Sequence, residues 1–174
     1  MPVNGKRLES RRNPRENVNM SKSLNRVREA LSTAGMAETI RETPNARTAQ
    51  DAANAIGCSV DQIAKSIIFS GTDTGCAILF LTAGGNSVDL IAAAAVAGQP
   101  LGKADATQVR AQTGFAIGGV SPVGHLNPIR TFIDPRLTDF REIWAAAGTP
   151  RHVFAISPSD LVRITDGQLI DFTR

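Results

Sequence analysis

The sequence predicts an α/β protein of the α+β type, in which helices pack around a mixed, largely antiparallel sheet. Helical and strand patterns alternate along the chain, but without the regular strand–helix–strand repeat of a doubly wound sheet. Several strand-like runs are also close neighbours in sequence, which favours antiparallel pairs. With 174 residues, of which 42% are hydrophobic, the chain can bury one sizeable core. We therefore expect a single domain over residues 20–174.

Residues 1–19 are expected to be a disordered N-terminal extension, because they show no apolar periodicity. They hold five basic and two acidic residues, so the formal net charge of +3 resides in this segment and the rest of the chain is balanced. The segment is either a basic arm that touches RNA or an extension before a start at Met20, and the second is preferred. A nucleic acid would therefore meet a local patch of the domain rather than a field of the whole molecule.

Capping signals define helices in the first third of the chain. An apolar face at helical spacing begins near Ser23, and Gly35 is placed to end that helix. Thr48 is an N-cap residue, and Ser59 with Gln62 has the capping-box pattern. The expected elements are a helix from Ser23 to about Gly35, a short strand over 37–43, a helix over 49–56 and a short helix from Ser59.

Two near-continuous apolar runs within residues 65–85, joined by a Gly-flanked turn, are typical of central buried strands. The segments that follow alternate between capped helices and short apolar strands. They are expected as a helix from Ser87 to Gly98, a helix from Asp105 to Gln112, strands over 115–117 and 129–134, a helix around 140–148, a strand over 152–156, a helical turn from Ser157 and a last strand over 168–172.

Several classes of site have no motif in this sequence. His125 and His152 stand outside any metal-binding pattern, so we expect no metal site. Cys58 and Cys76 form no Cys-x-x-Cys pair, which predicts neither a zinc site nor a disulfide framework and favours a reducing cytoplasm. No apolar stretch is long enough to span a bilayer, and no secretory signal pattern opens the chain.

Lys65 is the most informative single residue, because it lies where a short helix leads into a buried strand, in "QIAKSIIF". A lysine at that point can direct its ammonium group into a cleft, where it binds a phosphate or stabilises developing negative charge. It can equally be a solvated lysine at a strand edge, with its aliphatic stem on apolar neighbours.

A second candidate feature is the glycine-rich loop in "TGFAIGGVSPVGH". Gly118 and Gly119 lack a Cβ, so a ligand can approach their backbone, and successive N–H groups can form an anion-binding concavity. Pro122 fixes the shape of the loop. Ser121 does not fit a Gly-x-Ser-x-Gly nucleophile elbow, because Val123 replaces the second glycine. The loop is otherwise a tight connection between two strands.

The remaining polar candidates are less specific. His125, directly after the loop, is either a proton shuttle, a ligand contact or phosphate donor, or an exposed histidine without a chemical role. Arginines of the C-terminal third are candidates for the local basic patch. They are Arg130, Arg136, Arg141 and Arg151.

Lys65 in "QIAKSIIF", a strand pair after it, and the Gly-x-x-x-Pro loop about fifty residues later resemble the YbaK/EbsC family of aminoacyl-tRNA deacylases. These proteins are freestanding relatives of the editing domain of bacterial prolyl-tRNA synthetases. The resemblance extends from about Leu24 to the C-terminus. It implies a compact domain with a barrel-like sheet that hydrolyses the ester between an amino acid and the terminal ribose of tRNA, with no metal and no other cofactor.

The resemblance also implies roles for individual residues. Lys65 would be the catalytic residue that contacts the tRNA 3′ end, next to Ser66. The loop of Gly118, Gly119, Val120, Ser121 and Pro122 would hold the aminoacyl ester through its backbone, with His125 beside it. A water, or a hydroxyl or thiol group of the substrate, would attack the carbonyl. The segment "AAAGTP" would line the amino-acid pocket with Ala146, Ala147 and Gly148.

The implied substrate is a mischarged aminoacyl-tRNA, with tRNA(Pro) carrying a small non-cognate amino acid preferred and prolyl-tRNA synthetase as a possible partner. Some cysteine-clearing members of the family carry serine at the position of Ala146, so the alanine here speaks against a cysteinyl specificity, and the small apolar residues suit an alanine-sized or slightly larger side chain. Two alternatives remain open. One is a non-catalytic module that binds a tRNA end or a small nucleotide, and the other is an unrelated hydrolase that uses Ser121.

Overall fold

One mixed sheet organises the structure, which is a computed structural model that describes residues 14–174. Within this part of the chain the strand order is β1-β7-β6-β2-β3-β5-β8, and β4 pairs with β2. Four of the seven strand pairs are antiparallel and three are parallel. The predicted fold class is thus confirmed. The strands are β1 (Ile40–Glu42), β2 (Ile63–Gly71), β3 (Ala77–Ala83), β4 (Leu101–Lys103), β5 (Arg130–Ile133), β6 (Ile143–Ala146), β7 (His152–Ile156) and β8 (Gln168–Leu169).

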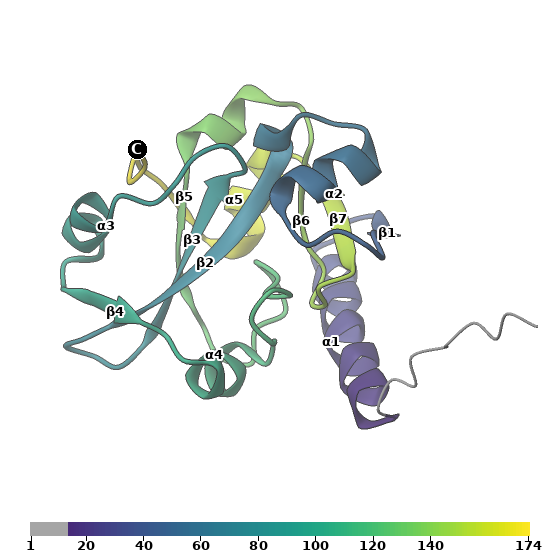
Figure 1. Cartoon of the computed structure of the whole chain (residues 1–174), viewed down its shortest axis with the longest axis horizontal. Helices are drawn as coiled ribbons and strands as arrows, with labels where there is room; N and C mark the ends of the chain where they lie inside the picture. The colour runs from purple at the N-terminus through teal and green to yellow at the C-terminus, as the bar shows by residue number, and fades with distance from the viewer. Residues whose placement is uncertain (1–13) are drawn as a thin grey trace, which may run out of the picture.

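Helices cover both faces of this sheet. Figure 1 shows α2 and α3 on one side and the long α1 with α5 on the other. Glycine residues in the left-handed region end α2, α3 and α4, as the sequence pattern indicates. The helices are α1 (Pro14–Thr33), α2 (Ala49–Ile56), α3 (Leu90–Ala97), α4 (Ala106–Thr113) and α5 (Pro158–Thr165), with 3-10 helices η1 (Val60–Gln62) and η2 (Pro135–Asp139).

Strand β3 lies at the centre of the core, and all its residues are buried. Leu79 and Leu81 pack in one apolar cluster with side chains of α1, α4 and α5, whereas Ile78 and Phe80 pack in another with side chains of α3. A third cluster joins α2 to β6 and β7 through Trp144. The near-continuous apolar run of β3 therefore reflects burial on both faces of the sheet.

The largest difference from the sequence-based expectation is the segment 140–148, which forms strand β6 rather than a helix. Side chains of β6 alternate between two clusters, with Ile143 and Ala145 in one and Trp144 in the other. The strand pairs with β7 on one edge and with β2 on the other. Pairing and burial on both faces thus outweigh the helix propensity of an alanine-rich segment.

Other boundaries also differ. Helix α1 begins at Pro14 rather than at Ser23, so residues 14–19 of the expected extension are helical, and residues 1–13 lie outside the described part of the chain. The expected strand over 115–117 is not formed, because these residues turn into the glycine-rich loop after Phe115 is buried. Strand β4 was not among the elements expected from the sequence.

Two further elements are shorter than expected. Helix α3 begins at Leu90 after an Asp89 cap, and not at Ser87. The last strand ends at Leu169, although Phe172 beyond it is fully buried in the cluster below α3. A single bridge between Val88 and Thr173 then fastens the end of the chain to the segment before α3.

Candidate functional site

Lys65 lies near the beginning of β2 and is half-buried. It faces Thr82 across the antiparallel ladder, and its Nζ donates a hydrogen bond of 2.5 Å to the backbone carbonyl of Asn86. An ammonium group carries three donors, so this bond fixes the side chain and leaves donors for a ligand. The helix-to-strand context recognised in the sequence thus corresponds to η1 leading into β2.

A buried carboxylate, Asp134, belongs to the same hydrogen-bond network. It follows β5, is 2% exposed, and accepts hydrogen bonds from the Ala83 amide (3.0 Å) and from the Asn86 side chain (2.9 Å). The backbone N–H of Arg136 donates to its second oxygen at 2.9 Å. Asp134 therefore fixes the segment after β3 that carries the carbonyl partner of Lys65.

Sequence reasoning missed Asn86 and Asp134. The signal was present, since each is a polar residue directly after or close after an apolar strand. Strands β3 and β5 are parallel neighbours, so their carboxyl ends lie at the same edge of the sheet. Polar residues that follow such strands commonly converge on a site.

The edge of β2 next to Lys65 is only partly covered. Strand β6 pairs with β2 at Ile63 and Ala64, and β4 pairs with it from Phe69 to Gly71. In the described chain, residues 65–68 have no ladder partner on this edge. Backbone groups on an open edge are available to a bound ligand. Ser66 lies in this open segment, and its hydroxyl is buried without a hydrogen-bond partner among the described residues.

The loop from Gly118 to Pro122 packs on the turn that follows β6. Gly118 has φ +90°, and a Cβ on Gly119 would lie 2.7 Å from the Cα of Thr149. Both positions therefore require glycine. The Gly119 amide donates to the carbonyl of Ala116 at 3.0 Å, which closes the turn.

Ser121 is fully buried, and its Oγ accepts a hydrogen bond of 3.2 Å from the Val123 amide. This contact makes the Ser121 side chain a local hydrogen-bonding group of the loop. It does not match an exposed nucleophile on a strained elbow, because the hydroxyl is turned into the protein. Val120 and Pro122 are buried beside it.

Strand β6 and the turn after it connect the strand of Lys65 to the glycine-rich loop. Ala64 pairs with Ala145, and four residues later Thr149 contacts Gly119. The backbones of Lys65 and Gly119 are therefore at most about 26 Å apart, since each residue spans at most about 3.5 Å and paired strands lie about 4.8 Å apart. Along β2, Lys65 alternates onto the side of Ile67 and Phe69, whereas Val120 packs in the cluster on the other side of the sheet.

The three small residues after β6 lie in different environments. Ala146 is half-buried at the end of the strand, whereas Ala147 is fully buried in the core. Gly148 has φ +92°, and a Cβ there would lie 2.8 Å from the carbonyl oxygen of Ser23 in α1. Of the three, Ala146 is thus the residue whose side chain remains accessible to a ligand.

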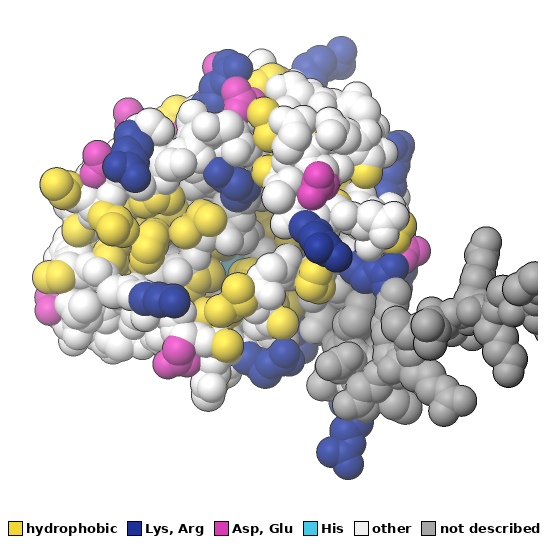
Figure 2. Space-filling view, viewed as in Figure 1, with side chains coloured by type: hydrophobic (Ala, Val, Ile, Leu, Met, Phe, Trp, Pro, Cys, Tyr) yellow, Lys and Arg dark blue, Asp and Glu magenta, His cyan; other side chains and the backbone are white. Residues whose placement is uncertain are grey.

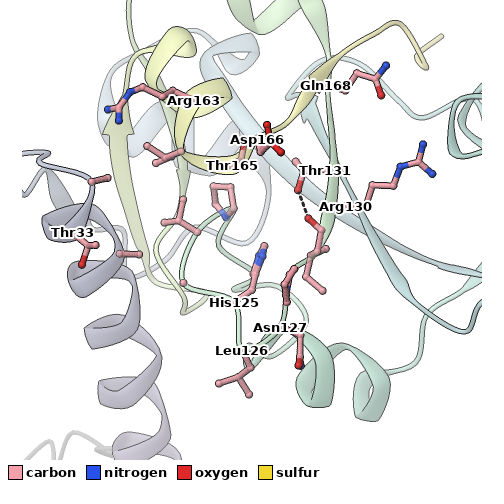
Figure 3. Close-up of a pocket in the computed structure, with 18 residues that line it drawn as sticks. Thr33, His125, Leu126, Asn127, Arg130, Thr131, Arg163, Thr165, Asp166 and Gln168 are labelled. Atoms are coloured by element: carbon pink, nitrogen blue, oxygen red, sulfur yellow. Dashed lines mark hydrogen bonds between the residues drawn. The ribbon is translucent and has the colours of Figure 1, made fainter.

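His125 lies on the far side of the loop, at the wall of a cavity of about 1030 Å³. The cavity is formed by the end of α1, the segment 122–131 and the end of α5, and Figure 3 shows His125 between these elements. Its Nε2 is 2.6 Å from the carbonyl oxygen of Ser121. Burial lowers the pKa of His125 below its ordinary value, the hydrogen bond to Ser121 opposes this shift, and the positive charge of Arg26 adds to it.

The arginines considered for a basic patch are mostly engaged elsewhere. Arg130 donates to the carbonyls that end α3 and stacks on Phe132, and Arg136 pairs with Asp61 and Asp139. Among residues 14–174, no group of three or more histidine, cysteine or acidic side chains is arranged to hold a metal ion. No helix in this range is long and apolar enough to cross a membrane.

A family model for the aminoacyl-tRNA editing domain matches residues 43–164, which include Lys65, Asp134 and the whole glycine-rich loop. The chain belongs to the aminoacyl-tRNA editing domain family. The resemblance to YbaK/EbsC proteins is thereby confirmed. The elements that carry this editing domain extend from just after β1 to the end of α5.

Similar proteins and structures agree with this assignment. YwhH of Bacillus subtilis is 32% identical over 120 residues, which are 69% of this chain and 75% of YwhH. An Enterococcus faecalis protein named "Putative Cys-tRNA(Pro)/Cys-tRNA(Cys) deacylase EbsC" is 24% identical over 127 residues, covering 72% of this chain and 77% of that protein.

Two solved structures have the same fold over most of the chain. A crystal structure described as "a putative trans-editing enzyme for prolyl tRNA synthetase" is 44% identical, with a TM-score of 0.82 over 87% of this chain and 97% of that one. The hypothetical protein APE2540 is 25% identical, with a TM-score of 0.78 over 86% and 99%.

Proposed function

We propose that this editing domain acts in trans to deacylate mischarged aminoacyl-tRNA, with tRNA(Pro) carrying a small non-cognate amino acid as its substrate. The observation that carries the proposal is the editing-domain match over a chain segment that contains both Lys65 and the Gly118–Pro122 loop. The choice of tRNA(Pro) rests on the names of the EbsC relative and of the 44% identical structure. The latter name also makes prolyl-tRNA synthetase the partner to test.

Lys65 would bind the 3′ end of the tRNA. Its ammonium group is oriented by the Asn86 carbonyl and keeps donors for a phosphate or ribose oxygen. Asp134 holds the Asn86 segment in place from the buried side. The terminal nucleotide would then lie against the open edge of β2, with the ester directed toward the loop.

The loop would stabilise the oxyanion that forms when water, or a nucleophilic group of the substrate itself, attacks the ester carbonyl. In the described chain the N–H groups of the exposed Gly118 and of Val120 make no hydrogen bond, whereas that of Gly119 donates to Ala116. Two preorganised N–H donors lower the barrier of an acyl-transfer step, and each is typically worth about 10²–10³ in rate. An activated ester requires such positioning more than a strong protein nucleophile.

The amino-acid pocket would be small. Ala146 is half-buried at the end of β6, and it replaces the serine carried there by some cysteine-clearing family members. An apolar methyl group at this position favours an alanine-sized side chain over the thiol of cysteine. We therefore expect faster release of alanine than of cysteine from tRNA(Pro).

The test is a deacylation screen with tRNA(Pro), tRNA(Ala) and tRNA(Thr), each charged with alanine, cysteine or serine. We expect release from Ala-tRNA(Pro), and a fall of about 10²-fold or more for Lys65→Ala. Lys103→Ala, at an exposed lysine of β4, is the matched control and should keep full activity. Binding of these tRNAs without any release would instead identify a non-catalytic module.

A further inference from the structure

The carbonyl of Ser121 is held by a histidine just beyond the loop. The chain turns back after Pro122, so that Nε2 of His125 lies 2.6 Å from the Ser121 oxygen. A carbonyl can only accept a hydrogen bond, so this contact requires a proton on Nε2. His125 is thus a donor to the loop rather than a group directed at the open edge of β2.

The ring of His125 is itself held in place. It packs edge-to-face on Phe115, with ring centroids 5.9 Å apart, and Phe115 is fully buried. The guanidinium of Arg26 lies 4.8 Å from the centroid of the same Phe115 ring and also donates to the carbonyl of Gly114. Gly114 and Phe115, which directly follow α4, therefore connect Arg26 of α1 to His125.

The position of the Ser121 carbonyl determines the shape of the end of the loop. The peptide group between Ser121 and Pro122 is planar, and Pro122 has a fixed φ and no N–H. The only hydrogen-bonding group of this peptide is therefore the carbonyl oxygen that His125 holds. The Ser121 side chain is bonded to Val123, so the His125 contact and this bond together fix the backbone around Ser121.

We propose that His125 is a positioning residue of the editing reaction, which holds the Ser121 carbonyl so that the preceding N–H groups of the loop face the ester. The inference rests on the proposed deacylase function. Without the donor, the Ser121 peptide can rotate, and displacements of about 1 Å in such a site cost on the order of 10²-fold in rate. The loss should appear in kcat, because contacts of Lys65 with the tRNA end are unchanged.

Two substitutions separate positioning from packing. His125→Phe keeps an aromatic ring against Phe115 but removes the donor, and we expect its kcat to fall by about 10–100-fold with KM changed less than threefold. His125→Gln keeps an N–H donor of similar reach and should recover most of kcat. Leu126→Ala is the matched control, because Leu126 is exposed at the same cavity and should leave kcat within about twofold.

A spectroscopic measurement tests the contact independently of activity. Side-chain ¹⁵N shifts of His125 in the wild-type protein at neutral pH should report the tautomer with the proton on Nε2. The opposite tautomer, or a His125→Phe variant with wild-type kcat, overturns the inference and leaves the proposed function intact. Wild-type protein that releases no amino acid from any tRNA in the screen overturns the proposed function, and the positioning role with it.

Discussion

Lys65 shows how one charged side chain obtains a defined position at the margin of an apolar sheet. Its ammonium group bonds the Asn86 carbonyl, and the Asn86 side chain bonds the buried carboxylate of Asp134. The cation and the carboxylate are thus joined through a neutral residue rather than paired directly. In a direct buried ion pair the ammonium group would donate to the carboxylate and the two charges would neutralise each other. In the observed arrangement, N–H donors of the ammonium group remain for a ligand.

Gly119 gives a prediction for the loop. In Gly119→Ala the new Cβ would lie 2.7 Å from the backbone of Thr149, and neither backbone can move without shifting the turn after β6. We expect the free energy of unfolding to fall by about 1–3 kcal/mol and the deacylation rate to fall by more than about tenfold. Urea titration and single-turnover deacylation measure the two effects.

Gly102→Ala in β4 is the control for this substitution, because a Cβ there meets its nearest atom at 3.5 Å, an ordinary contact distance. It should change neither stability nor rate appreciably. If Gly119→Ala behaved in the same way, the loop could not be packed on Thr149 as the structure has it.

The residues of the candidate site could be predicted only in part from the sequence. Lys65 and the loop glycines have local signals, namely a lysine at a helix-to-strand junction and adjacent glycines before a proline. Asp134 has a much weaker signal, because its meeting with Asn86 depends on the parallel pairing of β3 and β5. Register between strands so distant in sequence is set by packing, not by local pattern.

At the scale of elements, the helix caps have the most reliable local signal. Thr48 and Asp51 form the reciprocal capping box of α2, with both hydrogen bonds at 3.1 Å, and Ser59 with Gln62 does the same for η1. These bonds involve residues three apart, so the sequence alone predicts them. Strand β6 is the opposite case, because its alanines favour a helix and only the pairing with β2 and β7 makes it a strand.

The capping box of α2 gives a prediction at this scale. Thr48→Ala removes the hydroxyl that accepts from the Asp51 amide, and the free energy of unfolding should fall by about 1 kcal/mol. Thr48→Ser keeps the acceptor and should lose no more than a few tenths of a kcal/mol. Both variants should deacylate at the wild-type rate, since α2 packs on the face of β6 and β7 that carries Trp144, opposite the cluster that contains Val120 of the loop. A rate loss in Thr48→Ala alone would link α2 to the site.

At the scale of the whole molecule, exposed hydrophobic side chains and basic side chains are distributed differently over the surface. Figure 2 shows hydrophobic side chains gathered around α3, where Leu90 and Ile91 are exposed, while basic side chains are scattered over this face. The net charge of +3 belongs to residues 1–19, so the sheet and its helices carry no overall positive field. The proposed recognition of a tRNA end would therefore depend on local contacts at the open edge of β2 and not on long-range attraction.

The pH dependence of stability is a second property of the whole molecule, because His125 and His152 both contribute to it. Burial lowers the pKa of His125, and burial also lowers that of His152, against the charge of Glu42 and with that of Arg28. Arg26 is the charge that acts on His125, and Arg130, Arg163 and Asp166 line the same cavity. Both rings thus favour the neutral form in the folded protein.

The sign of the effect follows from linkage. A histidine with a lowered folded pKa binds its proton more readily in the unfolded chain, whose histidines titrate near about 6.5. The contribution of each histidine to the free energy of unfolding is therefore fully present above about pH 6.5. It is lost as the pH falls from there toward the lower folded pKa values. Urea unfolding at pH 7.5 and at pH 5 should give a lower midpoint at pH 5, and His125→Phe should reduce the difference.

Carboxylates with a lowered pKa, such as Asp51 and Asp160, lose their contribution to stability only near or below about pH 4, so they do not affect the comparison between pH 7.5 and pH 5. An equal or higher midpoint at pH 5 would mean that neither histidine is held neutral by its surroundings.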